Sequence, residues 1–206
     1  MVFAGIALGV ATSMFGQFYY QDRFREQLKH RLFITVLCAV ICAGVVYANM
    51  ICGTDIGAQL SAAVLCSSLI IIGAIDKEKM IIPNEIVGFL AIFRCVIIAL
   101  TIVKGEGDLK EVVTNYVGAA ALGCGVFLLA RLVSPSSIGF GDIKLFAVIG
   151  LYMGARGILP AVFCSLVFAL IFTVAKLIRK QITARDCFGF GPYIAMGTIF
   201  TMVIGG

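Results

Sequence analysis

Long apolar stretches without charged residues recur along almost the whole chain, and they constrain its fold more than any other feature. Of the 206 residues, 61% are hydrophobic and only 13% are charged. A soluble domain of this size needs a larger polar surface, whereas about 20 apolar residues suffice for one helix to cross a bilayer. The sequence therefore predicts an all-α, polytopic integral membrane protein. We expect a bundle of about eight transmembrane helices, with residues 1–206 forming one transmembrane domain and no soluble domain.

The gaps between charged residues define the expected spans. They are 1–21, Leu32–Thr54, Ile56–Ile75, Ile82–Val103, Val112–Ala130, Ile138–Ala155, Gly157–Ala175 and Cys187 to the C-terminus. Two spans contain charged residues: Arg94 lies in the fourth, and Asp142 and Lys144 lie near the start of the sixth. An ionisable residue at bilayer depth is costly, so each needs a partner or a function. For Arg94 we expect a buried ion pair or a polar cavity, with a partner from another span.

Basic residues indicate the orientation, because Lys and Arg favour cytoplasmic connections. With eight spans, one side of the membrane holds 12 basic residues and the other side only Lys104, Lys110 and Arg156. The termini then lie outside, and Asp76 and Asp142 both fall at the cytoplasmic edge of the cell membrane. The net charge of +5 follows from this bias. With no basic domain outside the membrane, nucleic-acid binding is not indicated.

Two carboxylates are the main candidates for chemistry. Asp142 follows two glycines in the stretch Gly139-Phe140-Gly141-Asp142, and Asp76 follows the third predicted span. Glycines let another backbone approach closely. If the two carboxylates meet across the bundle, repulsion and partial desolvation make them share one proton, as in aspartic proteases. Such a pair can activate a water molecule and protonate a scissile carbonyl. On spacing and composition alone, catalysis and ordinary interfacial charge are equally good interpretations.

Other chemistries have less support. The eight cysteines contain no Cys-x-x-Cys pair and lie mostly in apolar spans, so we interpret them as packing residues. His30 is the single histidine, which excludes a His-rich metal centre, and we expect neither a metal nor another cofactor. An alternative function is a small ion-coupled transporter in which intramembrane Asp residues and Arg94 form an ion path. Inverted repeats would favour the transporter, and none is evident in the sequence.

Three motifs occur in order along the chain. They are Asp76-Lys77-Glu78-Lys79-Met80-Ile81-Ile82-Pro83-Asn84, then Gly139-Phe140-Gly141-Asp142-Ile143-Lys144-Leu145, then Phe188-Gly189-Phe190-Gly191-Pro192-Tyr193. Together they resemble the type IV prepilin peptidase family, from about the third span to the C-terminus and including the positions of Gly150 and Gly154. The resemblance implies a polytopic aspartic endopeptidase of the GxGD type. Members remove the short basic leader of prepilins and pseudopilins on the cytoplasmic side of the membrane.

The resemblance also implies roles for single residues. Asp76 and Asp142 match the two catalytic aspartates. The residues matched to positions that shape the active site are Gly139, Gly141, Lys144, Pro83, Asn84, Gly191 and Pro192. Because the leader is basic, Glu78 and Glu85 are candidates to bind it by charge complementarity. The plainer interpretation of these two residues is that they are solvated helix ends.

The chain departs from the long form of the family near its N-terminal end. Many members carry a cytoplasmic insert with two Cys-x-x-Cys pairs after the first span and also methylate the new N-terminus. Here that connection is only Gln21 to Arg31, without such cysteines. The chain therefore resembles a short, peptidase-only form, like preflagellin and some pilus-assembly peptidases, and the departure argues against methyl transfer and S-adenosylmethionine. Presenilin-type Gly-x-Gly-Asp proteases carry a late Pro-Ala-Leu element that is missing here.

Overall fold

The computed structural model describes most of the chain from Ile56 onward. The described residues are 36, 39–41, 43–45, 47, 56–105, 108–133, 139–180 and 189–204. The first predicted span, His30 and most of the second predicted span lie outside them, as do Cys38, Cys42, Cys52 and Cys187. Within the described residues all regular structure is helical, which confirms the predicted all-α fold.

Five helices carry the described part of the chain after residue 55. They are α3 (Ile56–Lys79), α4 (Asn84–Val103), α5 (Leu109–Val133), α6 (Phe140–Ile178) and α7 (Gly191–Ile204). The first four are long and apolar enough to cross a bilayer, whereas α7 has 14 residues. The chain is therefore a multi-pass membrane protein. The predicted number of about eight spans remains a prediction, because it depends on residues outside this part.

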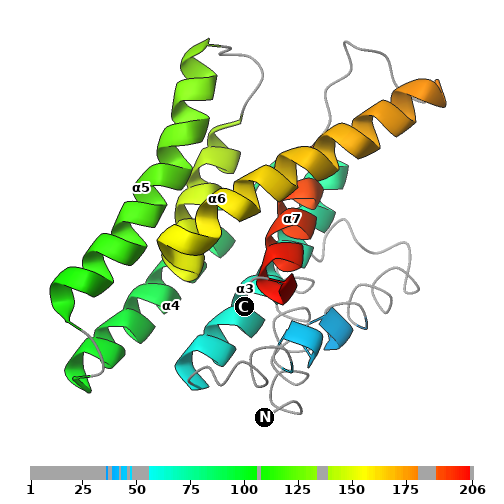
Figure 1. Cartoon of the computed structure of the whole chain (residues 1–206). Coiled ribbons are helices and arrows are strands. Elements are labelled where there is room, and N and C mark those ends of the chain that lie inside the picture. Colours follow the sequence, from blue (N-terminus) through cyan, green and yellow to red (C-terminus); the bar gives the residue numbers. More distant parts are fainter. Residues whose placement is uncertain are drawn as a thin grey trace.

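Gly154 divides α6 into two arms. Its φ of 66° and ψ of −176° are not helical, and glycine adopts such a positive φ without a steric penalty. In Figure 1 the first arm runs down to this bend and the second arm returns from it, so α6 is a helical hairpin. The two arms cover the residues of the two predicted spans that meet near Arg156. The first arm, residues 140–153, is about 21 Å long at 1.5 Å per residue, shorter than a hydrocarbon core of about 30 Å.

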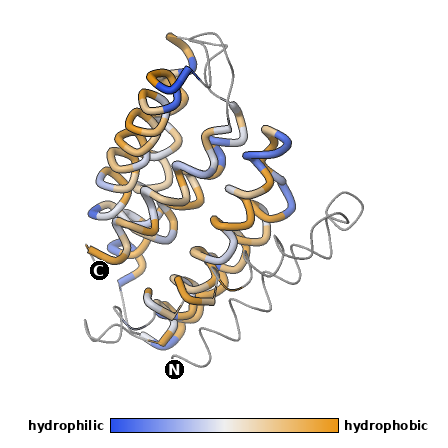
Figure 2. Tube along the Cα trace, turned by 90° about the vertical axis from the view of Figure 1, so that its right-hand side faces the viewer, coloured by the Kyte–Doolittle hydropathy of each residue, from blue (hydrophilic) through white to orange (hydrophobic). Residues whose placement is uncertain are grey.

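Successive helices alternate in direction along the bundle. As a result, α3, α5 and the second arm of α6 finish, and α4, α6 and α7 begin, at one end of the bundle (Figure 1). We call it the carboxylate end, because it carries Asp76 and Asp142. Basic residues in the last turns of α3, α5 and α6 and in the first turns of α6 also lie there: Lys77, Lys79, Arg131, Lys144 and Lys176. Figure 2 shows hydrophilic residues gathered toward helix ends and hydrophobic residues along the helices.

The two arms of α6 organise the packing of the bundle. α6 lies against α5 and α7, and α7 also lies against α3, whereas α3 and α6 touch each other only sparsely. Phe127 of α5 and Phe146 of α6 stack with ring centroids 4.2 Å apart. A Cβ on Gly150 would lie 2.5 Å from the Ala119 carbonyl oxygen, so glycine is what allows α5 and α6 to pack so closely. α3 and α6, which carry the two aspartates, are therefore held in place mainly by their contacts with α5 and α7.

Candidate active site

Asp76 occupies the last turn of α3, where the helix reaches the carboxylate end. Its side chain is only 4% exposed. The helix stops three residues later, because Met80 adopts a left-handed φ of 54°. The backbone N–H of Gly191, at the start of α7, donates a hydrogen bond to Asp76 Oδ2 at 2.7 Å. A buried carboxylate is costly without a donor, and here a backbone amide from a distant segment supplies one.

The late glycine motif lies directly on Asp76. A Cβ on Gly191 would be 2.8 Å from Asp76 Cβ, and a Cβ on Gly189 would collide with the Asp76 carboxylate and carbonyl oxygens. The segment can approach the aspartate this closely only because both positions lack a side chain. Pro192 follows in the first turn of α7, where a missing N–H is tolerated. The sequence assigned Gly191 and Pro192 to the wall of the site, and the structure brings Gly191 into contact with Asp76.

Asp142 stands in the first turn of α6. The N–H of Gly139, which caps the helix with extended φ and ψ of −72° and 145°, donates to Asp142 Oδ2 at 3.3 Å. A carboxylate at a helix N-terminus also interacts favourably with the helix dipole. A Cβ on Gly141 would lie 2.9 Å from Ile82 Cβ, so the linker that follows α3 packs against this turn. Asp142 is partly exposed, in contrast to Asp76.

The structure brings the two carboxylates to the same end of the bundle. They come from α3 and α6, and they lie close enough for the charge of Asp76 to act on Asp142. One of the pair is buried and hydrogen-bonded to a backbone amide, and the other is partly exposed. The structure therefore places both aspartates at one end of the bundle, and their position at the cytoplasmic membrane edge remains a prediction.

The start of α4 joins the same site. Pro83 is the buried residue that precedes α4, with an extended φ of −66° and ψ of 122°, and the helix begins at Asn84. Asn84 accepts a hydrogen bond through Oδ1 from Lys144 Nζ at 3.2 Å, which links α4 to the first turns of α6. Glu78 and Glu85 are exposed at this end, one at the end of α3 and one in the first turn of α4. Their role in substrate binding remains a prediction.

Arg94 is buried in α4, with 6% of its surface exposed. Its Nε donates to the Leu151 carbonyl at 2.9 Å, and its two terminal nitrogens donate to Ser61 Oγ at 3.0 Å and to the Tyr152 carbonyl at 3.5 Å. The guanidinium carbon also lies 4.7 Å from the Tyr116 ring centroid and 5.4 Å from the Tyr152 ring centroid. The expected partners from other spans are present, and these are neutral oxygens and aromatic rings.

Ser61 and Asn115 were not identified from the sequence, although both contribute to the polar region near Arg94 and the break at Gly154. Asn115 of α5 accepts a hydrogen bond from the N–H of Ala155 at 2.8 Å, directly after the break at Gly154. The available signal was a polar side chain within an apolar helix, where polar groups tend to face neighbouring helices. That signal does not by itself name the partner.

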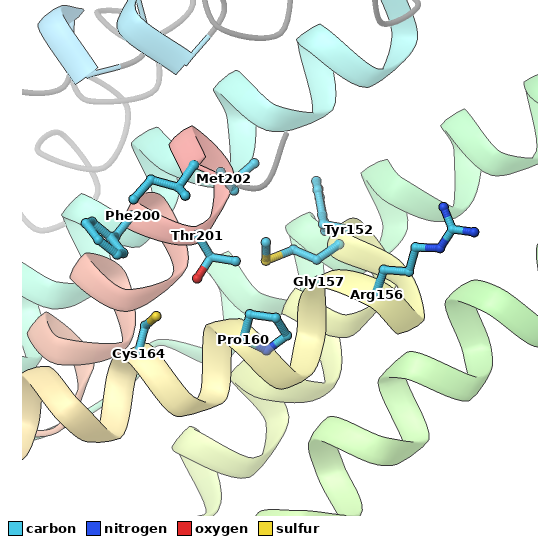
Figure 3. A pocket seen from close by; sticks show the side chains of 10 residues that line it. Tyr152, Arg156, Gly157, Pro160, Cys164, Phe200, Thr201 and Met202 are labelled. Atoms are coloured by element: carbon cyan, nitrogen blue, oxygen red, sulfur yellow. The ribbon is translucent and has the colours of Figure 1, made fainter. Parts of the chain in front are cut away.

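A cavity of about 360 Å³ lies away from the carboxylate pair, between α6 and α7. Figure 3 shows Tyr152, Pro160, Cys164 and Thr201 around it, while the Arg156 guanidinium points away from the other lining side chains. None of the predicted site residues lines this cavity. In the part of the chain that the structure describes, no group of three or more His, Cys, Asp or Glu residues is placed to hold a metal ion.

These features define a class of protein: a multi-pass helical membrane protein with two carboxylates from different helices at one end of its bundle. Comparison with known families is more specific. The sequence model of the type IV leader peptidase family matches residues 63–174, which include Asp76 and Asp142. The chain belongs to this family, and the resemblance seen in its motifs is confirmed.

Curated relatives carry a consistent name. A prepilin leader peptidase/N-methyltransferase of Bacillus subtilis (strain 168) is 29% identical over 191 residues, covering 91% of this chain and 73% of the relative. Proteins of the same name from Burkholderia pseudomallei and Pectobacterium carotovorum are 26% and 27% identical over 150 residues. These two matches cover 72% and 70% of this chain and about half of each relative, 48% and 51%. No solved structure shows a significant match to the chain.

Proposed function

We propose that this protein is an intramembrane aspartic endopeptidase that cleaves the leader peptide from type IV prepilins or similar precursors. The observation that supports it most is the pair of carboxylates, Asp76 and Asp142, which two helices bring within range of each other's charge at one end of the bundle. The family identifies the reaction as leader cleavage, and the names of the relatives indicate prepilins as the substrate class.

Peptide hydrolysis by this pair requires one carboxylate to be ionised and the other protonated. The ionised member accepts a proton from a bound water as the water oxygen attacks the scissile carbonyl carbon, and the protonated member donates its proton to the carbonyl oxygen. The tetrahedral species then collapses, the C–N bond breaks, and the amine leaves with a proton returned from the pair. Because the two aspartates share one proton, Asp76 and Asp142 act as a unit in this scheme.

The surroundings of the pair suit this chemistry. The N–H of Gly191 fixes Asp76 in position, and partial exposure of Asp142 lets water reach the site. Preorganised groups need no rearrangement when the reaction begins. A substrate segment in the bilayer can approach from between helices, while its basic leader stays outside the membrane near Glu78 and Glu85.

We place the carboxylate end at the cytoplasmic face of the cell membrane. Basic residues at this end include two in the last turn of α3 and one in the last turn of each of α5 and α6. Lys and Arg are enriched in cytoplasmic connections, which favours this orientation. Cleavage would then occur on the side where precursors are synthesised.

Other functions have weaker support. The findings give no support to the small ion-coupled transporter, because Arg94 is held by carbonyl oxygens and aromatic rings within the bundle. The names of the relatives pair the peptidase with an N-methyltransferase. Methyl transfer is not part of our proposal, because the connection from Gln21 to Arg31 lacks the paired cysteines of the long form.

The decisive experiment is cleavage of a purified prepilin by the purified protein in detergent or nanodiscs. Asp76→Asn and Asp142→Asn each remove one member of the pair while keeping nearly the same shape, and each should lower kcat by about 1,000-fold. Asp108→Asn is the control, because Asp108 is exposed before α5 at the opposite end of the bundle. Full cleavage by either site variant would refute the proposed function.

A further inference from the structure

The break at Gly154 leaves backbone groups without their usual helical partners. In an unbroken helix the N–H of Ala155 would donate to the carbonyl of Leu151, four residues earlier. The non-helical φ and ψ of Gly154 interrupt this pattern. The carbonyls freed at Leu151 and Tyr152 accept partly buried and buried bonds, and a buried polar group left unpaired is costly. Neighbouring helices must therefore supply partners.

Two side chains from different helices fill this need. Arg94 of α4 donates to the carbonyls of Leu151 and Tyr152, at 2.9 and 3.5 Å, at the end of the first arm. Asn115 of α5 accepts from the N–H of Ala155, at 2.8 Å, at the beginning of the second arm. Arg94 thus acts as a C-terminal cap and Asn115 as an N-terminal cap of the two arms.

Arg94 also reaches a third helix. Its remaining terminal nitrogen donates to Ser61 Oγ of α3 at 3.0 Å in a buried bond. One guanidinium therefore joins α3, α4 and the first arm of α6. Because α3 and α6 touch each other only sparsely, this bridge is one of the few connections between the two helices that carry Asp76 and Asp142.

We propose that Arg94, through Ser61 on α3 and the Leu151 carbonyl on α6, is a positioning residue that sets the separation of the two aspartate-bearing helices. The bridge lies well inside the bundle, away from the reacting atoms. Leu151 is nine residues beyond Asp142, or about 14 Å along the helix, and Ser61 is fifteen residues before Asp76, or about 22 Å. A small rotation of either helix at the bridge becomes a displacement at the carboxylate end.

This inference rests on the proposed function, and its kinetic signature follows from the shared proton. If the carboxylates move apart, their mutual repulsion weakens and the pH range over which kcat is high narrows from both sides. A misplacement of about 1 Å can lower kcat about 100-fold. Substrate binding depends on other groups, so KM should change much less than kcat.

The test compares three variants at the bridge. Arg94→Gln should lower kcat about 100-fold with a narrowed pH profile, and Arg94→Lys should restore part of kcat because an ammonium group can still donate to two oxygens. Ser61→Ala removes the link between Arg94 and α3, together with the bond that Ser61 Oγ donates to the Gly57 carbonyl of its own helix at 2.7 Å, and it is the variant least at risk of misfolding. It should lower kcat about tenfold and narrow the pH profile in the same way.

Ser67→Ala is the matched control for Ser61→Ala. Ser67 is also buried on α3, and like Ser61 its hydroxyl donates to carbonyls of its own helix, at Ala63 and Val64, but the bond from Arg94 goes to Ser61. We expect wild-type kcat and pH profile for this control. The inference is overturned if Ser61→Ala behaves like Ser67→Ala, or if Arg94→Gln loses activity only in proportion to its unfolded fraction with an unchanged pH profile.

A second measurement needs no cleavage and so separates this inference from the proposed function. Nitroxide labels at Lys77 and Phe140, both exposed at the carboxylate end, report the distance between α3 and α6 by pulsed electron paramagnetic resonance. The eight native cysteines are first replaced by alanine. Ser61→Ala should shift or broaden the distance distribution and Ser67→Ala should not. An unchanged distribution in Ser61→Ala overturns the positioning role, whether or not the protein cleaves prepilins.

Discussion

The first arm of α6 has a polar centre near each end, and the two centres are built in opposite ways. At the bend, Arg94 donates to three oxygens from α3 and α6 and lies against two tyrosine rings. At the carboxylate end, Asp76 and Asp142 each accept one backbone N–H from the described residues, and they lie within range of each other's charge. A buried charge with partners on every side stabilises the fold. Two neighbouring carboxylates with few protein partners can still bind a water molecule and a substrate.

The comparison predicts that the two centres respond differently to small changes. Damage at the carboxylate end should lower catalysis more than stability, whereas loss of the Asn115 cap at the bend, which carries no link to α3, should lower stability first. Three variants test this contrast, in addition to the replacements of Asp76, Asp142, Arg94 and Ser61 described above.

The largest of the three effects is expected for Gly191→Ala. The new methyl group would lie 2.8 Å from Asp76 Cβ, so the aspartate or the start of α7 must move. We expect kcat to fall about 100-fold while the melting temperature changes little. Gly125→Ala is the control, because a Cβ at that helical position meets nothing within 4 Å. Equal activity of the two alanine variants would break the comparison.

A smaller effect is expected for Asn115→Ala, and this substitution should lower stability more than catalysis. It removes the acceptor of the Ala155 N–H in an exposed hydrogen bond, which should lower the free energy of unfolding by about 0.5–1.5 kcal/mol. Activity per folded molecule should fall less than in Gly191→Ala. Thermal unfolding in detergent measures the change, with the exposed neighbour Thr114→Ala as control. If the two variants unfold at the same temperature, Asn115 is no cap.

The smallest effect is expected where side chains are exposed. Reversing the charge of Glu78 and Glu85 together should raise KM for a basic-leader substrate about three- to tenfold, with kcat nearly unchanged, because exposed charge pairs are weak. The increase should shrink at high salt. Glu111→Lys, in the first turn of α5 at the opposite end, is the control. An unchanged KM in the double variant would leave both glutamates as solvated helix ends.

Much of the fold, and the placement of both aspartates at one end of the bundle, could be predicted from local sequence patterns. Charge-free stretches located α3 and α4 to within a few residues, and the bias of Lys and Arg placed Asp76 and Asp142 at one end. Both inferences depend on hydropathy and charge, which can be read from a residue and its neighbours in the sequence. For the same reason the break between the two arms of α6 was predicted near Arg156 and is found at Gly154.

The remaining features depend on contacts between segments far apart in the chain. Nothing in the sequence near Asp76 indicates that its donor is the N–H of Gly191, 115 residues later. The partners of Arg94 could not be predicted either, because the Leu151 carbonyl becomes available only once the backbone breaks at Gly154. An expected partner for a buried arginine is an acid, whereas here a distortion of another helix creates the acceptors.

The bond between Gly191 and Asp76 also has a consequence for the timing of synthesis. A ribosome adds Gly191 long after Asp76 has entered the membrane, since 115 positions separate them. Until α7 is inserted, Asp76 lacks its donor and Gly189 and Gly191 do not yet cover it. A nascent chain therefore carries both aspartates before the contact between α7 and Asp76 has formed.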